Sequence, residues 1–297
     1  HKFFCYRIFW LGAVARDICH EYTRTPLLSI LGIDASMDLG QDLTKADPDH
    51  SMFGISDRAI IDVADSFVAV KHLVYDDKVL TMDELMTALD SNFAGERGEE
   101  IRQLCLHQPK YGNDNEEADA MVRRVSDESA RIIYAYDNSP FRNMIISREG
   151  LAWHYFGGLG AGALPDGRPA LEPLNDGSLS PMRGADKNGP TAVLRSAMSS
   201  GYSDVCCSAV LNQKFNSSLL RSSESIDKLV AYTNAFMKNG GTHIQYNILD
   251  TEQLKDAKAH PEKYPDLIVR IGGFSAYFVE VYKECQDYII KRTELSI

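Results

Sequence analysis

The sequence predicts an α/β fold with mostly parallel strands, and three stretches in its last third carry that prediction. "VCCSAVLNQKF" is an apolar run typical of a buried strand, and "THIQYNIL" alternates apolar and polar residues as a second strand does. Between them, "SESIDKLVAYTNAFMKNGG" has helical spacing and ends at glycines that suit a helix C-cap. Because a helix joins the two strands, we expect them to be parallel neighbours.

The composition is that of a globular chain that can bury a large core. Its 297 residues are 44% hydrophobic and 25% charged, with a net charge of −11. A nucleic-acid surface or an anionic membrane would need clustered Lys and Arg, so this charge argues against both kinds of partner. We therefore expect a small molecule or another protein as partner, and neither nucleic acid nor membrane.

Helical patterns dominate the part before residue 136. Residues 1–32 read as an amphipathic helix broken at Pro26, and residues 32–54 read as a polar connection. The next helix is predicted to begin at Ser56 as N-cap and to present one apolar stripe, made of Ile60, Val63, Ala64, Phe67, Val70 and Val74.

Two further helices and a long irregular segment follow. Thr81 and Glu84 have the spacing of a capping box, and residues 116–136 again have helical spacing. Glycines and prolines are then frequent from residue 157 to 190, which predicts irregular backbone. Loops of this length inside a compact protein are usually functional.

The C-terminal stretch predicts a helix, a strand pair and a last helix. "TEQLKDAKAHPEKY" is a helix stopped before Pro261, and "DLIVRIGGFSAYFVEV" reads as strand, glycine turn, strand. "KECQDYIIKRTEL" is the terminal helix. The commonest use of a Gly-Gly pair such as Gly272-Gly273 is a tight hairpin turn.

The cysteines and the N-terminus give expectations about location and completeness. Six cysteines without a CxxC pair or zinc-like spacing are expected to be free thiols in a reducing cytoplasm. Charged residues interrupt the first apolar stretch, so it is too short to span a membrane. The chain begins on His1 in the middle of a helical pattern, and we expect it to be a piece of a longer protein.

Several motifs favour ordinary structural interpretations. "GGLGAG" at residues 157–162 is followed by too many prolines to open the helix that a dinucleotide site requires. Cys19-His20-Glu21 lies on an amphipathic helix, where a buried Cys with exposed neighbours is expected. His243 is expected to be a core histidine, and Cys206 and Cys207 should point to opposite faces of an extended chain.

Taken with its surroundings, "RIGGFSAYF" resembles the signature of glycyl radical enzymes, the pyruvate formate-lyase superfamily. Further segments resemble that family in the same order, from about residue 56 to the end: "DVADSFVAVKHLVYDD", "PKYGND", "GALPDGRPALEPLNDGSLSP", "DKNGPTAVL", "LNQKF", "NGGTHIQYNILD" and "HPEKYPDLIVR". Chance matches do not keep their order over such a length.

The resemblance implies that Gly273 carries a stable backbone radical, installed by a radical S-adenosylmethionine activating enzyme with an iron-sulfur cluster. Loss of an α-hydrogen leaves a planar centre, and glycine has no side chain to strain it. Ile271, Phe274 and Phe278 would shield that centre, with Phe274 in the place of a frequent tyrosine. No bound cofactor or metal is expected in the chain itself.

The resemblance also implies a fold and an activity. The fold is the second half of a ten-stranded α/β barrel, made of two five-stranded parallel half-sheets with surrounding helices, over residues 1–170, followed by a glycyl radical domain over residues 171–297. The activity is that of an oxygen-sensitive, anaerobic radical lyase, with a dehydratase or an arylacetate-type decarboxylase favoured. The alternatives are a formate acetyltransferase, a fumarate-adding synthase or a non-catalytic spare-part module. A homodimer is expected.

In this family a thiyl radical on a facing cysteine loop attacks the substrate, and the resemblance places that cysteine upstream of residue 1. The chain is thus expected to lack its catalytic cysteine loop. Within the chain, five side chains are open as acid-base residues, although each has the sequence context of a turn or capping residue: Asp34, Asp38, His154, Asp166 and Asp176.

Overall fold

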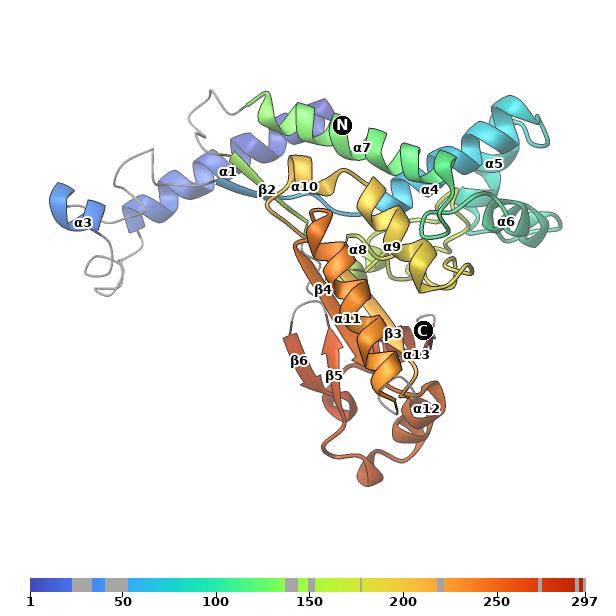
Figure 1. The fold of residues 1–297 in the computed structure, drawn as a ribbon. Helices are drawn as coiled ribbons and strands as arrows, with labels where there is room; N and C mark the ends of the chain where they lie inside the picture. The colour runs from blue at the N-terminus through green and yellow to red at the C-terminus, as the bar shows by residue number, and fades with distance from the viewer. Residues whose placement is uncertain are drawn as a thin grey trace. The chain divides into compact units, whose positions relative to one another are not determined.

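The computed structural model describes residues 1–22, 34–40, 53–136, 144–148, 153–176, 178–217, 222–271, 274–291 and 294–295. Figure 1 shows the helices and strands of the chain. The chain divides into two compact units, which are described separately. The first comprises residues 1–57 and 127–147, and the second comprises residues 58–126 and 148–297.

The first unit contains α1 (Lys2–Tyr22), α3 (Asp34–Leu39), β1 (Phe53–Ser56) and most of β2 (Met144–Arg148). β1 and β2 are parallel, with Phe53 opposite Met144. α1 confirms the first predicted helix, whereas Pro26 lies outside the described residues. The prediction of a polar connection over 32–54 is wrong where α3 forms and where β1 begins, because Phe53 and Gly54 pair with the backbone of β2.

The start of the next helix also differs from the prediction. Ser56 ends β1 and its hydroxyl donates to the Ser147 carbonyl, so it is not an N-cap. The helix α4 (Ile60–Val70) instead begins after Ala59, whose φ of 61° is left-handed, and it continues as a π-helix over Lys71–Asp76.

The apolar stripe predicted for α4 is only partly correct. Ile60 and Ala64 are buried, but Val63 and Phe67 are 40% and 52% exposed. The buried face of α4 therefore differs from the predicted stripe. It includes the side chains of Asp62 and Asp65, which are both fully buried.

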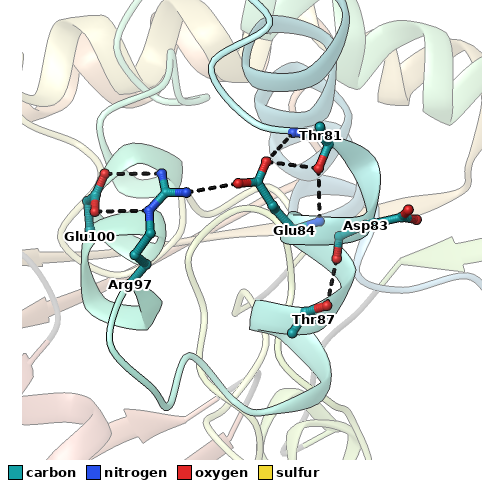
Figure 2. Close-up of polar contacts among 6 residues, drawn as sticks. All are labelled: Thr81, Asp83, Glu84, Thr87, Arg97 and Glu100. Atoms are coloured by element: carbon teal, nitrogen blue, oxygen red, sulfur yellow. Dashed lines mark hydrogen bonds and ion pairs between the residues drawn. The ribbon is translucent and has the colours of Figure 1, made fainter.

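The helices α5 (Met82–Asp90), α6 (Gly98–Leu106) and α7 (Glu116–Tyr134) follow. Figure 2 shows how the first of them is capped. The Thr81 hydroxyl accepts from the Glu84 N–H at 3.2 Å, and the Glu84 carboxylate accepts from the Thr81 N–H at 2.8 Å, which confirms the predicted capping box. Arg97 then joins Glu84 to Glu100, so α5 and the start of α6 are linked.

The predicted irregular segment begins later than expected. The helix α8 (Trp153–Leu159) covers its first residues, and irregular backbone then runs to α9 (Pro190–Ser199). Much of this backbone is buried, including Asp166, Arg168 and Asn175. Buried backbone that belongs to no helix or sheet must find hydrogen-bond partners in side chains.

The side chains on α4 and nearby loops provide those partners. Asp62 accepts from the Asn175 N–H at 3.1 Å, and Asp65 accepts from the Tyr111 N–H at 3.0 Å. Asp166 accepts from the Arg168 N–H at 2.9 Å. The loops that carry Tyr111 and Asn175 are therefore fixed to α4 by its carboxylates.

Burial also changes the acidity of these carboxylates. Desolvation, followed by the charge of Asp166, raises the pKa of Asp62, and desolvation raises the pKa of Asp166. Desolvation raises the pKa of Asp65 to about 7, against the opposing effects of the Lys110 charge and the Tyr111 N–H.

The predicted parallel pair is confirmed in the second unit. β3 (Ser208–Phe215) pairs in parallel with β4 (His243–Ile248) and with β7 (Glu294–Leu295). The helices α10 (Tyr202–Val205) and α11 (Ser223–Lys238) precede β3 and β4, and α11 ends before Gly240, whose φ is +87°. Tyr232 of α11 packs edge-on against Phe215 of β3.

The last elements are α12 (Thr251–Ala259), a short 3-10 turn (Pro261–Lys263), β5 (Ile268–Ile271), β6 (Phe274–Tyr277), a second 3-10 turn (Phe278–Glu280) and α13 (Lys283–Lys291). β5 and β6 are antiparallel, as predicted. The chain therefore has the predicted α/β character with parallel strands. Among the described residues, no helix is both long enough and apolar enough to cross a bilayer.

We expect Asp65→Asn to change the pH dependence of stability. The wild-type carboxyl is protonated in both states below about pH 4, but between about 4 and 7 only the native state keeps its proton. Proton binding to Asp65 therefore favours the native state at low pH, and the wild-type free energy of unfolding falls as the pH rises through that window. Asn keeps an oxygen for the Tyr111 N–H and cannot ionise, so the variant should gain on the order of 2–4 kcal/mol relative to wild type across it.

Urea unfolding at several pH values checks this expectation. The matched control is Asp227→Asn, because Asp227 lies exposed on α11. A relative gain from Asp65→Asn no larger than that of the control would contradict the burial of an ionisable Asp65.

Candidate functional site

The predicted site is the Gly272-Gly273 link between β5 and β6. The two glycines lie outside the described residues, but both flanking strands are described. Ile271 is paired with Phe274 and Arg270 with Ser275, so the ladder is in register up to the residues on either side of the link. The Arg270 guanidinium donates to the Ser275 hydroxyl at 2.8 Å, which adds a cross-strand contact.

Asn247 of β4 anchors the strand that leads into this link. Its side-chain oxygen accepts from the Arg270 N–H at 2.8 Å, and its side-chain nitrogen donates to the Arg270 carbonyl at 3.0 Å. The Asn247 side chain is only 3% exposed, so the anchor is a buried amide. One side-chain amide thus satisfies both backbone groups of a residue three positions before Gly273.

An apolar cluster supports the base of the strand pair. Val269 and Phe278 are fully buried against α12 and α13, together with Leu254, Ala257, Tyr288 and Ile289. The Phe278 N–H donates to the Leu267 carbonyl at 2.7 Å, and Gln286 of α13 donates to the Phe278 carbonyl at 2.8 Å. Phe278 is buried in this cluster. Gly273 and the side chains of Ile271 and Phe274 lie outside the described residues, so the shielding of Gly273 stays a prediction.

The parallel strands β3 and β4 carry buried polar side chains that the sequence patterns did not predict. Asn212, Gln213 and Lys214 of β3 are buried, as are Gln245 and Asn247 of β4. The Lys214 amine donates to the Thr251 hydroxyl at 3.0 Å and to the Ile290 carbonyl at 3.2 Å. Polar residues inside otherwise apolar strand patterns were the sequence signal that could have indicated these buried side chains.

Of the five candidate acid-base residues, the structure brings His154 and Asp176 together. His154 Nδ1 lies 3.5 Å from Asp176 Oδ1, and both side chains are buried. The His154 ring also lies 4.6 Å from that of Tyr288, and the Arg183 guanidinium is 5.0 Å from the centre of the same Tyr288 ring. This network connects α8 and the irregular segment to α13.

The other three occupy separate places. Asp166 is a turn residue as predicted, since its carboxylate accepts from the N–H two residues on and Gly167 has φ of +96°. Asp34 and Asp38 are exposed on the short helix α3. None of these three belongs to the His154 network.

The cysteines are free thiols, as predicted. Cys206 is buried and Cys207 is exposed, which confirms that they face opposite ways. Desolvation raises the pKa of the Cys105 thiol to about 11 and raises that of Cys285. The expectation of a buried Cys19 is wrong, because it lies on an exposed side of α1.

Two other motif interpretations can be checked against the elements. Gly157 and Gly158 lie inside α8, and no helix follows "GGLGAG" before residue 176 in the described chain, as expected for a sequence that is not a dinucleotide fingerprint. His243 begins β4 and is half-buried rather than a core histidine.

Comparison with known proteins places these features in a family. Residues 7–155 match the model described as pyruvate formate lyase-like, and residues 176–279 match the glycine radical model. The trans-4-hydroxy-L-proline dehydratase of Clostridioides difficile is 32% identical over 95% of this chain and 35% of its own length. The isethionate sulfite-lyase of Oleidesulfovibrio alaskensis is 39% identical over 78% of this chain and 28% of its own length.

A solved structure gives the same result for the fold. The glycerol-bound B12-independent glycerol dehydratase from Clostridium butyricum superposes with a TM-score of 0.91 and 31% identity, over 100% of this chain and 37% of that one. This chain spans about a third of the length of these relatives.

We expect Asn247→Ala to loosen β5. The substitution leaves the Arg270 N–H and carbonyl without their side-chain partner, which should speed amide exchange at Arg270 by about tenfold or more. Hydrogen exchange read by NMR or mass spectrometry measures this rate. Asn239→Ala is the control, because that amide donates to Ala235 at the exposed end of α11. Unchanged exchange at Arg270 in Asn247→Ala would show that the anchor lies elsewhere.

Proposed function

Because the chain belongs to the pyruvate formate lyase-like family of glycyl radical enzymes, we propose that Gly273 is its radical residue and that it serves an anaerobic radical lyase. The observation that carries the proposal is the position of Gly273. It falls within the match to the glycine radical model, next to a strand whose last residues are held by Asn247.

The chemistry proposed for Gly273 has two hydrogen-atom transfers. An activating enzyme with an iron-sulfur cluster uses S-adenosylmethionine to remove one α-hydrogen, which leaves an electron shared between the neighbouring amide nitrogen and carbonyl. The glycyl radical then takes a hydrogen atom from a cysteine thiol, and the thiyl radical so formed attacks the substrate. The shielded base of the hairpin, with Val269 and Phe278 buried, fits a radical that must be kept from water.

We propose C–O bond cleavage of a small organic substrate as the reaction, in the manner of a dehydratase. The names of the hydroxyproline and glycerol dehydratases support this class, and the sulfite-lyase supports a lyase more broadly. A decarboxylase of the arylacetate type remains the alternative. Because the relatives are about three times as long as this chain, the activity, the substrate and a homodimeric assembly are proposals about the whole enzyme.

The proposal also covers the barrel and the division of the chain into two parts. The parallel strands would form part of a ten-stranded barrel, and the likeness to the glycerol dehydratase supports this. A division into a barrel part over 1–170 and a glycyl radical part over 171–297 agrees with family matches that end at residue 155 and begin at residue 176. Within the second unit, the bond from the Asn175 N–H to Asp62 crosses that boundary. A cytoplasmic location is likewise proposed.

Electron paramagnetic resonance tests the radical assignment. Anaerobic incubation of the chain with the activating enzyme of a relative, S-adenosylmethionine and a reductant should give a doublet, because one α-hydrogen remains on the radical carbon. Growth on α-deuterated glycine should collapse that splitting. Gly273→Ala should abolish the signal, and the matched variant Gly272→Ala should retain part of it.

Two results would overturn the assignment. A doublet that survives Gly273→Ala would place the radical on another residue. A signal that is lost in Gly272→Ala but kept in Gly273→Ala would move it to the neighbouring glycine.

A further inference from the structure

The second unit contains a polar cleft that is lined by other residues than those of the β5–β6 hairpin. It is bounded by the end of α6, by the loop over residues 107–115 and by the loop over residues 182–188, and it encloses about 740 Å³. None of the described residues that line it comes from β5 or β6. Its volume lies in the range of pockets that hold small molecules.

The two loops are fixed to each other by amide side chains. Asn113 donates to the Ala185 carbonyl at 2.8 Å, and its oxygen accepts from the Lys187 N–H at 2.8 Å. Asn188 returns a bond to the Asn113 carbonyl at 3.0 Å. The cleft is thus preorganised, which lowers the conformational entropy that the two loops would lose when a ligand binds.

Close packing at Gly112 reinforces this arrangement. Its φ of +92° is left-handed, and a Cβ at this position would lie 2.3 Å from the Pro181 ring. No other residue type fits there without moving Gly112 or Pro181, which directly precedes the second loop.

The lining is rich in cations although the chain as a whole carries −11. Lysine and arginine side chains come from both walls: Arg102, Lys110, Arg183 and Lys187. Asp114 is the one acidic side chain among the described residues of the lining, and Arg195 pairs with it at 2.8 Å from outside. A concave site whose lining carries a net positive charge attracts a ligand of negative charge.

The cations differ in how far they are already engaged. Arg183 pairs with Glu172 at 2.8 Å and Arg102 with Glu99 at 3.3 Å, so each guanidinium keeps further donors. The buried Lys110 amine donates to the Cys105 carbonyl at 2.9 Å. Lys187 is exposed at the cleft.

We propose that this cleft binds a small molecule bearing a phosphate group. A phosphate presents several oxygens to donors from different directions, which matches cations and amides that come from two facing loops. The site is separate from the radical chemistry proposed for Gly273, and its occupancy does not depend on that assignment.

Calorimetric titration of the chain with inorganic pyrophosphate, free of divalent metal and at low ionic strength, tests the proposal. Lys187→Glu should weaken binding by about tenfold or more, because it reverses a charge at the site. Lys263→Glu makes the same charge change on the exposed 3-10 turn after α12 and should weaken binding by less than about twofold.

Citrate, with a similar charge carried on carboxylates, is the second titrant. Pyrophosphate binding that depends on Lys187 and exceeds citrate binding supports the proposal. The absence of pyrophosphate binding to the wild-type chain, equal weakening by both lysine variants, or citrate binding as tightly as pyrophosphate would overturn it. Lys187→Met serves as a second variant if circular dichroism shows that Lys187→Glu is not folded.

Discussion

Buried backbone outside helices and sheets must be hydrogen-bonded, and much of the second unit depends on how that requirement is met. The carboxylates of Asp62 and Asp65 reach from α4 to the backbone of Asn175 and Tyr111, and Asp166 holds its own turn. Leaving such a donor unpaired costs about 1–3 kcal/mol. The raised pKa of each carboxyl reflects what its burial costs, so the contacts hold the loops in place without being individually large sources of stability.

At the glycine hairpin, too, a buried side chain forms hydrogen bonds with the backbone of a distant residue. β5 and β6 pair with each other, and the contact with β4 includes the two hydrogen bonds from Asn247 to Arg270. The short strand pair is thus positioned by these hydrogen bonds and by the apolar cluster around Val269 and Phe278. Positioning of this kind suits the function proposed for Gly273, in which an activating enzyme must reach the link between β5 and β6.

Several features of the fold could be predicted from the sequence because their signals are local, whereas the helix α3 and the strand β1 were not predicted. The capping box at Thr81 and Glu84, the parallel strands around α11 and the turn at Asp166 all follow from residues close in sequence. The inward turn of Asp62 and Asp65 could not be predicted, because their partners lie far along the chain and an acidic pair on a helix is usually solvent-facing. Asn247 was missed for the same reason, as its partner Arg270 belongs to another strand.

The central claim, a radical on Gly273, is tested most directly by exposing activated protein to air. A carbon-centred backbone radical adds dioxygen at its α-carbon, and the peroxyl product breaks the chain at that residue. The account predicts a single cut that requires prior activation, with a small product that begins near Phe274 and ends at Ile297, read by mass spectrometry. Cleavage at another position, or an intact chain despite a confirmed radical signal, would contradict it.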